Sequence, residues 1–230
     1  MQTLAEGFFT QDEQQKITQA VQRAEQQTAG EIVPMVVSAS HAYPEAELTG
    51  AAVLALPAAL AAALVTGSFF WWQGEVLWLF LGYLSVLFLF ARLMVRRSPS
   101  LLRLFIRRQR VAVEVERAAF THFYAAGLQD TRDATGVLIY ISVLERRVWI
   151  LGDRGINEKI PQQTWQAFVT RLTAGIREKR QGAALCASIE EIGSLLHTHF
   201  PPKDDDRNEL SDLIIEAENT SNPGHTLIVK

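Results

Sequence analysis

The apolar run at residues 48–95 constrains this chain more strongly than any other part of it. Polar interruptions at residues 66–68 and 73–75 divide the run into two limbs. A bilayer core about 30 Å thick needs about 20 apolar residues for each helix, so the run predicts a hairpin of two transmembrane helices. A buried helical pair in a soluble domain is the alternative, but no polar face interrupts either limb.

The residues around the hairpin indicate how it would cross the membrane. Trp71, Trp72 and Trp78 cluster between the limbs, where an interfacial aromatic belt would lie. Residues 92–110 hold seven arginines and no acidic residue, whereas residues 67–75 hold no basic residue. By the positive-inside rule the arginines lie in the cytoplasm. We therefore expect a two-pass protein of the bacterial inner (cytoplasmic) membrane with both termini in the cytoplasm.

The same arginines predict a membrane surface that binds anionic lipid headgroups. They are Arg92, Arg96, Arg97, Arg103, Arg107, Arg108 and Arg110. The formal net charge of the whole chain is -3, so the basic charge is local, which argues against nucleic acid as a partner. The single cysteine, Cys186, excludes an internal disulfide framework and a multi-cysteine metal site. The amino terminus has no basic stretch followed by an apolar one, so no cleavable signal peptide is expected.

Outside the hairpin, hydrophobic periodicity predicts alternating helices and strands. A capping box at residues 10–13 opens the first helix, and a buried strand follows at residues 31–38. Pro34 lacks the N–H that a ladder needs, so it should lie at a strand start, a bulge or an edge. After the hairpin, a long helix is expected from Pro99 to Gly127.

The remaining residues supply two more strands and two more helices. The strand at 137–143 is expected at the sheet centre, and the strand at 147–151 should pair with it as a hairpin. The strands at 31–38 and 137–143 should be parallel, because a crossover helix joins them. The fold class is therefore α/β, a small mixed sheet covered by helices, with the two-helix transmembrane hairpin inserted into it. Two helices follow, at residues 161–182 and 183–199.

This order of elements predicts one domain in two pieces. Residues 1–47 and 96–200 would form a cytoplasmic domain, and residues 48–95 would form the transmembrane hairpin between them. Residues 201–230 are expected to be an acidic, flexible tail.

Polar residues at the expected strand ends give one candidate site. Asp133 precedes one strand and Asp153 follows its antiparallel partner, so both loops should lie at the same end of the sheet. Asn157 could join them, and oxygen ligands converging in this way suit a divalent cation, Ca²⁺ or Mg²⁺. The alternative is that these residues only form turns and caps. Glu145 lies in the opposite turn and is a poor partner.

Three stretches resemble the TPM domain family. They are residues 25–33 (EQQTAGEIV), residues 136–139 (GVLI) and the hairpin 147–155 that ends in Gly-x-x-Gly. The resemblance spans about residues 8 to 200, with the transmembrane hairpin as an insertion. It implies an α/β/α sandwich, and it associates the chain with phosphatase-type activity, calcium binding and the maintenance of membrane complexes.

The functional prediction is a non-enzymatic, membrane-anchored interaction module that assists assembly, maintenance or quality control of membrane proteins. No nucleophile elbow, P-loop or H-E-x-x-H motif occurs, so no catalytic residue and no cofactor are assigned. The alternative is a metal-dependent phosphatase that uses Asp133, Asp153 and Asn157 with a divalent cation. The expected partners are the lipid bilayer and other membrane proteins, including a LemA-like protein or a second TPM protein.

Overall fold

The computed structural model describes residues 3–69, 76–131, 134–202, 210–216 and 226–229. The chain forms two compact units. Met1–His41 and Ala112–Lys230 together form the first, and Ala42–Val111 forms the second. The chain thus leaves its first unit, builds the second and returns. The second unit is longer than the apolar run itself, because its first helix begins earlier and a short helix follows the second span.

The first unit consists of a sheet and the helices that pack on it. In chain order its elements are α1 (Gln11–Glu25), β1 (Glu31–Val37), most of α5 (Arg108–Ala125), the 3-10 helix η1 (Leu128–Asp130), β2 (Gly136–Ser142), β3 (Arg147–Gly152), α6 (Arg154–Lys159), α7 (Gln162–Arg177), α8 (Gln181–His199), β4 (Leu213–Glu216) and β5 (Thr226–Val229). The second unit contains α2 (Pro44–Phe69), α3 (Val76–Arg97) and α4 (Pro99–Phe105).

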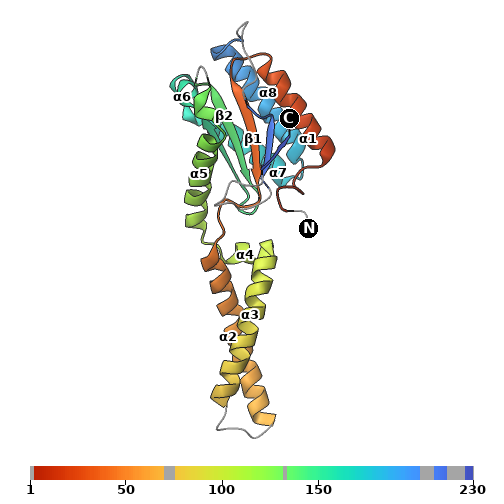
Figure 1. Cartoon of the computed structure of the whole chain (residues 1–230), viewed down its shortest axis with the longest axis vertical. Coiled ribbons are helices and arrows are strands. Elements are labelled where there is room, and N and C mark those ends of the chain that lie inside the picture. Colours follow the sequence, from red (N-terminus) through yellow and green to blue (C-terminus); the bar gives the residue numbers. More distant parts are fainter. Residues whose placement is uncertain (1–2, 70–75, 132–133, 203–209, 217–225, 230) are drawn as a thin grey trace. The chain divides into compact units, whose positions relative to one another are not determined.

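The strands form a five-stranded mixed sheet in the order β3-β2-β1-β4-β5 (Figure 1). β1 pairs in parallel with β2 and with β4, whereas the pairs β2–β3 and β4–β5 are antiparallel. The predicted pairing of β1, β2 and β3 is confirmed, but the central strand is β1 and not β2. The sequence also predicted a flexible tail after residue 200, where the structure has β4 and β5. β4 is only four residues long, too short for hydrophobic periodicity to identify it.

Pro34 lies inside β1, where the sequence did not predict it. The Glu31 N–H donates to Thr135 O on the β2 side at 3.2 Å. Backbone groups alternate along a strand, so those of Glu31 and Val33 face β2, whereas the Pro34 nitrogen faces β4. β4 pairs only with residues 35–37 of β1, so the proline interrupts no ladder hydrogen bond. Ile32 faces the same side, and its N–H donates to Glu25 Oε1 at 3.0 Å. The Glu25 carboxyl group therefore replaces the missing part of β4.

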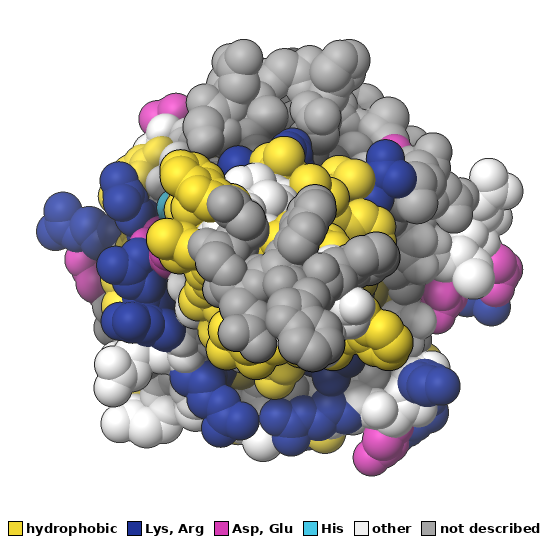
Figure 2. All heavy atoms as spheres, turned by 90° about the horizontal axis from the view of Figure 1, so that it is seen from below, with side chains coloured by type: hydrophobic (Ala, Val, Ile, Leu, Met, Phe, Trp, Pro, Cys, Tyr) yellow, Lys and Arg dark blue, Asp and Glu magenta, His cyan; other side chains and the backbone are white. Residues whose placement is uncertain are grey.

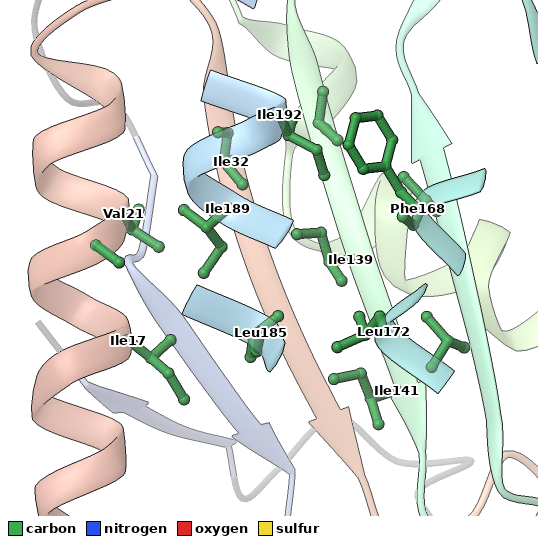
Figure 3. Close-up of a cluster of buried hydrophobic side chains, with 14 of the residues drawn as sticks. Ile17, Val21, Ile32, Ile139, Ile141, Phe168, Leu172, Leu185, Ile189 and Ile192 are labelled. Carbon is green, nitrogen blue, oxygen red and sulfur yellow. The ribbon is translucent and has the colours of Figure 1, made fainter. Parts of the chain in front are cut away.

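Helices cover both faces of the sheet, as the predicted α/β/α sandwich requires. On one face α1, α7 and α8 contribute fully buried aliphatic side chains such as Ile17, Leu172 and Ile189 to one cluster with the side chains of the sheet (Figure 3). On the other face, α5 buries Val115, Ala119 and Phe123. The His122 ring of α5 stacks on the Tyr140 ring of β2, with 5.6 Å between their centroids.

The long helix predicted from Pro99 to Gly127 is two helices. α4 ends at Phe105, and Ile106 then takes an extended conformation (φ -74°, ψ 127°) before α5 begins. α4 packs on the hairpin, and a Cβ added to Gly50 of α2 would lie 2.7 Å from the Phe105 ring. This contact is tertiary, so helical periodicity in the local sequence does not reveal the break. The six-residue helix α6 was also not predicted.

The hairpin itself is held by small residues along one stripe of α2. Ala51, Ala55, Ala59 and Ala63 recur every four residues and are buried, which lets the two backbones approach closely. Thr66 Oγ1 and Tyr83 OH form a hydrogen bond between the helices at 3.0 Å. Figure 2 shows the chain from below, with hydrophobic side chains grouped around the middle of this face.

Both helices are long and apolar enough to cross a membrane, which fits a membrane protein. Most of the large apolar side chains of α2 that lie off the small-residue stripe are exposed, as lipid contact would require. Of the predicted aromatic belt, Trp78 is 69% exposed, whereas Trp71 and Trp72 lie outside the described residues.

Candidate functional site

A groove of about 720 Å³ runs along β3 in the first unit. Every residue of β3 lines it, from Arg147 to Gly152. Aromatic side chains of α5 form one wall, and Trp165 and Val169 of α7 contribute to the other. Its size is within the range of ligand-binding pockets, about 300–1,000 Å³. The whole length of β3 therefore lines one cavity between two helices.

β3 is an edge strand, and half of its backbone groups point into this open space. The Asp153 N–H donates to Gly136 O at 2.8 Å, which sets the alternation of the antiparallel pair. The backbone groups of Trp149 and Leu151 therefore face β2. Those of Val148, Ile150 and Gly152 face outward. The Gly152 carbonyl accepts a hydrogen bond from Asn157 Nδ2 at 2.5 Å. Within the described ranges, the backbone of Val148 and Ile150 has no hydrogen-bond partner on its outward side.

Between Arg147, which is charged, and Gly152, whose carbonyl is capped by Asn157, the edge has few of the features by which proteins usually block strand addition. The sequence of β3 is RVWILG, with no proline and no lysine, and its register with β2 continues without a bulge. Val148 and Ile150 point into the core on the α7 side, where they are 6% and 8% exposed. Trp149 and Leu151 point to the α5 side and are half-buried. An incoming strand would thus meet apolar side chains on both faces.

The charges along the groove balance one another. Its lining includes two acidic side chains, Glu116 and Asp153, and two basic ones, Arg147 and Arg154. Arg154 Nε is already paired with a carboxylate oxygen of Glu158 at 2.9 Å. The groove therefore carries no net charge that would select an anionic or a cationic ligand.

Two of the three predicted metal ligands lie at one end of the groove. Asp153 is the N-cap of α6, and its Oδ1 accepts the Arg154 N–H at 2.7 Å. Its buried Oδ2 has no hydrogen-bond partner among the described residues. Asn157 lies one turn later and uses its amide to hold the Gly152 carbonyl. Asp133 lies outside the described residues.

These side chains act as caps of local structure, and they do not complete a cation site by themselves. A Ca²⁺ ion takes about six to eight oxygen ligands, whereas Asp153 and Asn157 contribute one carboxylate and one amide. In the part of the chain that the structure describes, no group of three or more His, Cys, Asp or Glu side chains is arranged to hold a metal ion. A metal at Asp133, Asp153 and Asn157 stays a prediction.

A second polar cluster, which the sequence did not predict, lies at the carboxyl ends of β1 and β2. The Ser40 N–H donates to Glu145 Oε1 at 2.8 Å, and the Ser142 hydroxyl donates to Glu145 Oε2. Ser40 Oγ donates to Ser142 Oγ at 3.0 Å. Because a hydroxyl group has only one proton, Tyr140 OH is the donor to Ser40 Oγ, which lies 3.1 Å away. All of these hydroxyl protons thus point toward one buried carboxylate. Glu145 is indeed in the turn opposite Asp153, as the sequence predicted.

This cluster stabilises the sheet end more than it resembles a hydrolytic site. Ser142 donates directly to the Glu145 carboxylate, as a nucleophile would to its base, but Ser142 is fully buried and Glu145 is 8% exposed, so a substrate could not reach this hydroxyl. The nearby His122 lies against Glu216 instead, with Nε2 3.3 Å from Oε2. Burial lowers the pKa of His122 and the Glu216 charge opposes this, while burial raises the pKa of Tyr140. The network ties the segment after β1 to the β2–β3 turn.

The predicted lipid-binding arginines all belong to the second unit. Arg103 is half-buried and the other six are exposed. Arg110 pairs with Glu45, with 2.5 Å between Nη1 and Oε1, and Arg92 Nε lies 3.9 Å from Glu47 Oε2. The sequence did not predict these two acidic partners at the start of α2. Contact with lipid remains a prediction for all seven residues.

Comparison with known proteins supports the fold. Residues 105–195 match the family model described as the TPM domain and named TPM phosphatase. The NMR structure of the BA42 protein from the psychrophilic bacterium Bizionia argentinensis is similar to this chain with a TM-score of 0.55 and 21% sequence identity. The match covers 90% of this chain and 94% of that one, and at this identity it concerns the fold alone. No curated protein matched the sequence. The resemblance to the TPM domain is confirmed.

Proposed function

We propose that this chain, which carries a TPM domain matched over residues 105–195, is a membrane-anchored interaction module. It assists the assembly, maintenance or quality control of other membrane proteins. The observation that supports this proposal is the groove along β3, whose outer edge pairs with no other strand among the described residues and lies between apolar walls. Such an edge is a template for another chain.

The hairpin supplies the membrane location in this proposal. α2 and α3 cross the bacterial inner membrane, and the arginines after α3 stay in the cytoplasm. Both termini and the first unit then lie in the cytoplasm, with the arginines near anionic headgroups. The partners are other membrane proteins, among which a LemA-like protein and a second TPM protein are candidates.

Site-specific photo-cross-linking in native membranes tests the proposal. A photoreactive residue replaces Gln166, which is exposed and lines the groove, or Gln163, which is exposed on the same helix but does not line it. We expect reproducible adducts with membrane proteins from position 166 and few from position 163. Absence of adducts at position 166, or the same adducts at both positions, would overturn the proposal.

Topology is tested separately by labelling intact cells. A cysteine introduced at residue 205, in a chain whose Cys186 is changed to serine, should react with a membrane-impermeant reagent only after the cells are opened. Labelling of intact cells would show that the carboxyl-terminal segment lies outside the cytoplasm.

A further inference from the structure

We propose that the groove binds an extended, uncharged and apolar peptide segment of a partner protein, which adds to β3 as a new strand. This inference rests on the proposed function and specifies how the partner is recognised. It belongs to the class of interactions in which a peptide extends an exposed sheet edge.

The backbone of β3 favours an extended segment over other occupants. Val148 and Ile150 each direct an N–H and a C=O outward, and residues two apart in a strand are separated by about 6.8 Å. A second strand presents complementary groups at the same spacing. A helix uses its own backbone groups internally, so it could not satisfy those of β3.

The walls of the groove specify the side chains. One face of an added strand would lie against Phe120, Phe123 and Tyr124 of α5, and the other against Trp165 and Val169 of α7. Phe120 is 45% exposed and Tyr124 61% exposed, so these rings are open to a partner. Because the charged groups in the lining balance, a charged segment would gain no net attraction and would lose hydration.

The experiment uses the full-length protein in detergent micelles and the blocked, neutral peptide acetyl-TVTVTVT-amide. Two N-methylated versions of this peptide carry the same number of methyl groups. In one, the three valines are methylated, so only one edge of the strand is blocked. In the other, three consecutive central residues are methylated, so both edges are blocked. Binding is measured by titration, together with hydrogen exchange at the Val148 and Ile150 amides.

The peptide blocked on one edge should bind within about threefold of the unmodified peptide, because its other edge can pair with β3. The peptide blocked on both edges should bind at least about tenfold more weakly, since buried backbone groups of β3 lose their partners. Exchange at the Val148 and Ile150 amides should slow only with the peptides that bind.

A matched pair of protein variants locates the binding. Val169→Arg places a long charged side chain in the groove, whereas Thr170→Arg changes the neighbouring exposed residue, which does not line it. Val169→Arg should weaken binding at least about tenfold and Thr170→Arg should leave it unchanged. Both variants are checked for an unchanged thermal transition.

Other outcomes overturn the inference. Equal affinities for the two methylated peptides, or no saturable binding, would exclude strand addition; the proposed function would still stand if position 166 cross-links to membrane proteins. Absence of those adducts as well would overturn both strand addition and the proposed function. A dimer of this chain that protects the Val148 and Ile150 amides and resists the peptide would show that a second copy occupies the groove.

Discussion

Replacing Glu25 with glutamine should remove a pH dependence of stability that the fold creates. Glu25 is largely buried near the carboxyl groups of Glu31 and Asp212, and it accepts the Ile32 N–H where β4 does not reach. Burial, followed by the negative charge of Glu31, raises the pKa of Glu25 to about 9. The folded protein therefore holds this carboxyl group protonated at neutral pH.

The sign and size of the effect follow from proton linkage. In the unfolded chain the group titrates near its ordinary pKa of 4.5, so between the two pKa values only the folded state keeps the proton. The stability that this proton contributes is fully present below the unfolded pKa and is lost as pH rises toward the folded one. The free energy of unfolding should fall by up to about 1.4 kcal/mol per pH unit in this interval.

Urea unfolding of the full-length protein in micelles, followed by tryptophan fluorescence, measures this slope. Glutamine keeps an oxygen that can accept the Ile32 N–H but has no proton to lose, so Glu25→Gln should be close to wild type at about pH 5 and more stable at about pH 8. Glu190→Gln is the control, since Glu190 is exposed and its ion pair with Arg23 is long, 3.6 Å. Equal slopes for wild type and Glu25→Gln would show that Glu25 does not keep its proton in the folded protein.

Three further changes test the packing and the caps. Lys179 has φ 59° where the turn after α7 favours glycine, so Lys179→Gly should raise the free energy of unfolding by about 0.5–1 kcal/mol, whereas Lys179→Ala should not. A Cβ at Gly193 would lie 2.7 Å from the Ala24 Cβ, so Gly193→Ala should cost about 1–3 kcal/mol in thermal unfolding, and Ser194→Ala on the exposed side should cost little. Asp153→Ala should cost about 1 kcal/mol through loss of the α6 cap, and Asp153→Asn less. If Ca²⁺ or Mg²⁺ raises the melting temperature of wild type but not of Asp153→Asn, this favours a metal site at Asp153 over a role as helix cap alone.

The elements that the sequence predicted are those with a local or strongly periodic signal. The capping box at Thr10 and Glu13 forms as expected, with the Glu13 N–H 3.2 Å from Thr10 Oγ1 and the Thr10 N–H 2.9 Å from Glu13 Oε2. The hairpin was also predicted, because two apolar limbs of membrane length leave few alternatives. The parallel pair β1–β2 followed from the crossover between them.

The rest depends on contacts between distant residues. β4 is a four-residue run whose place beside β1 depends on pairing with residues 35–37, about 180 positions earlier. Pro34 could not be placed correctly without knowing where β4 begins. The groove was not predicted for the same reason. The sequence RVWILG is compatible with an edge strand and with a central strand, so it does not show that β3 lies at the edge of the sheet. Asp153 was predicted to lie at a strand end, and it does. The sequence could not show that its side chain caps α6.

We propose the β3 groove as the surface through which the first unit meets other membrane proteins. The most direct test is the yield of photo-cross-links in native membranes from position 166, compared with that from position 163, with and without Val169→Arg. We expect a higher yield of membrane-protein adducts at position 166, and Val169→Arg should reduce that yield to the level at position 163. Equal yields at the two positions, or a yield at position 166 that Val169→Arg leaves unchanged, would contradict this proposal.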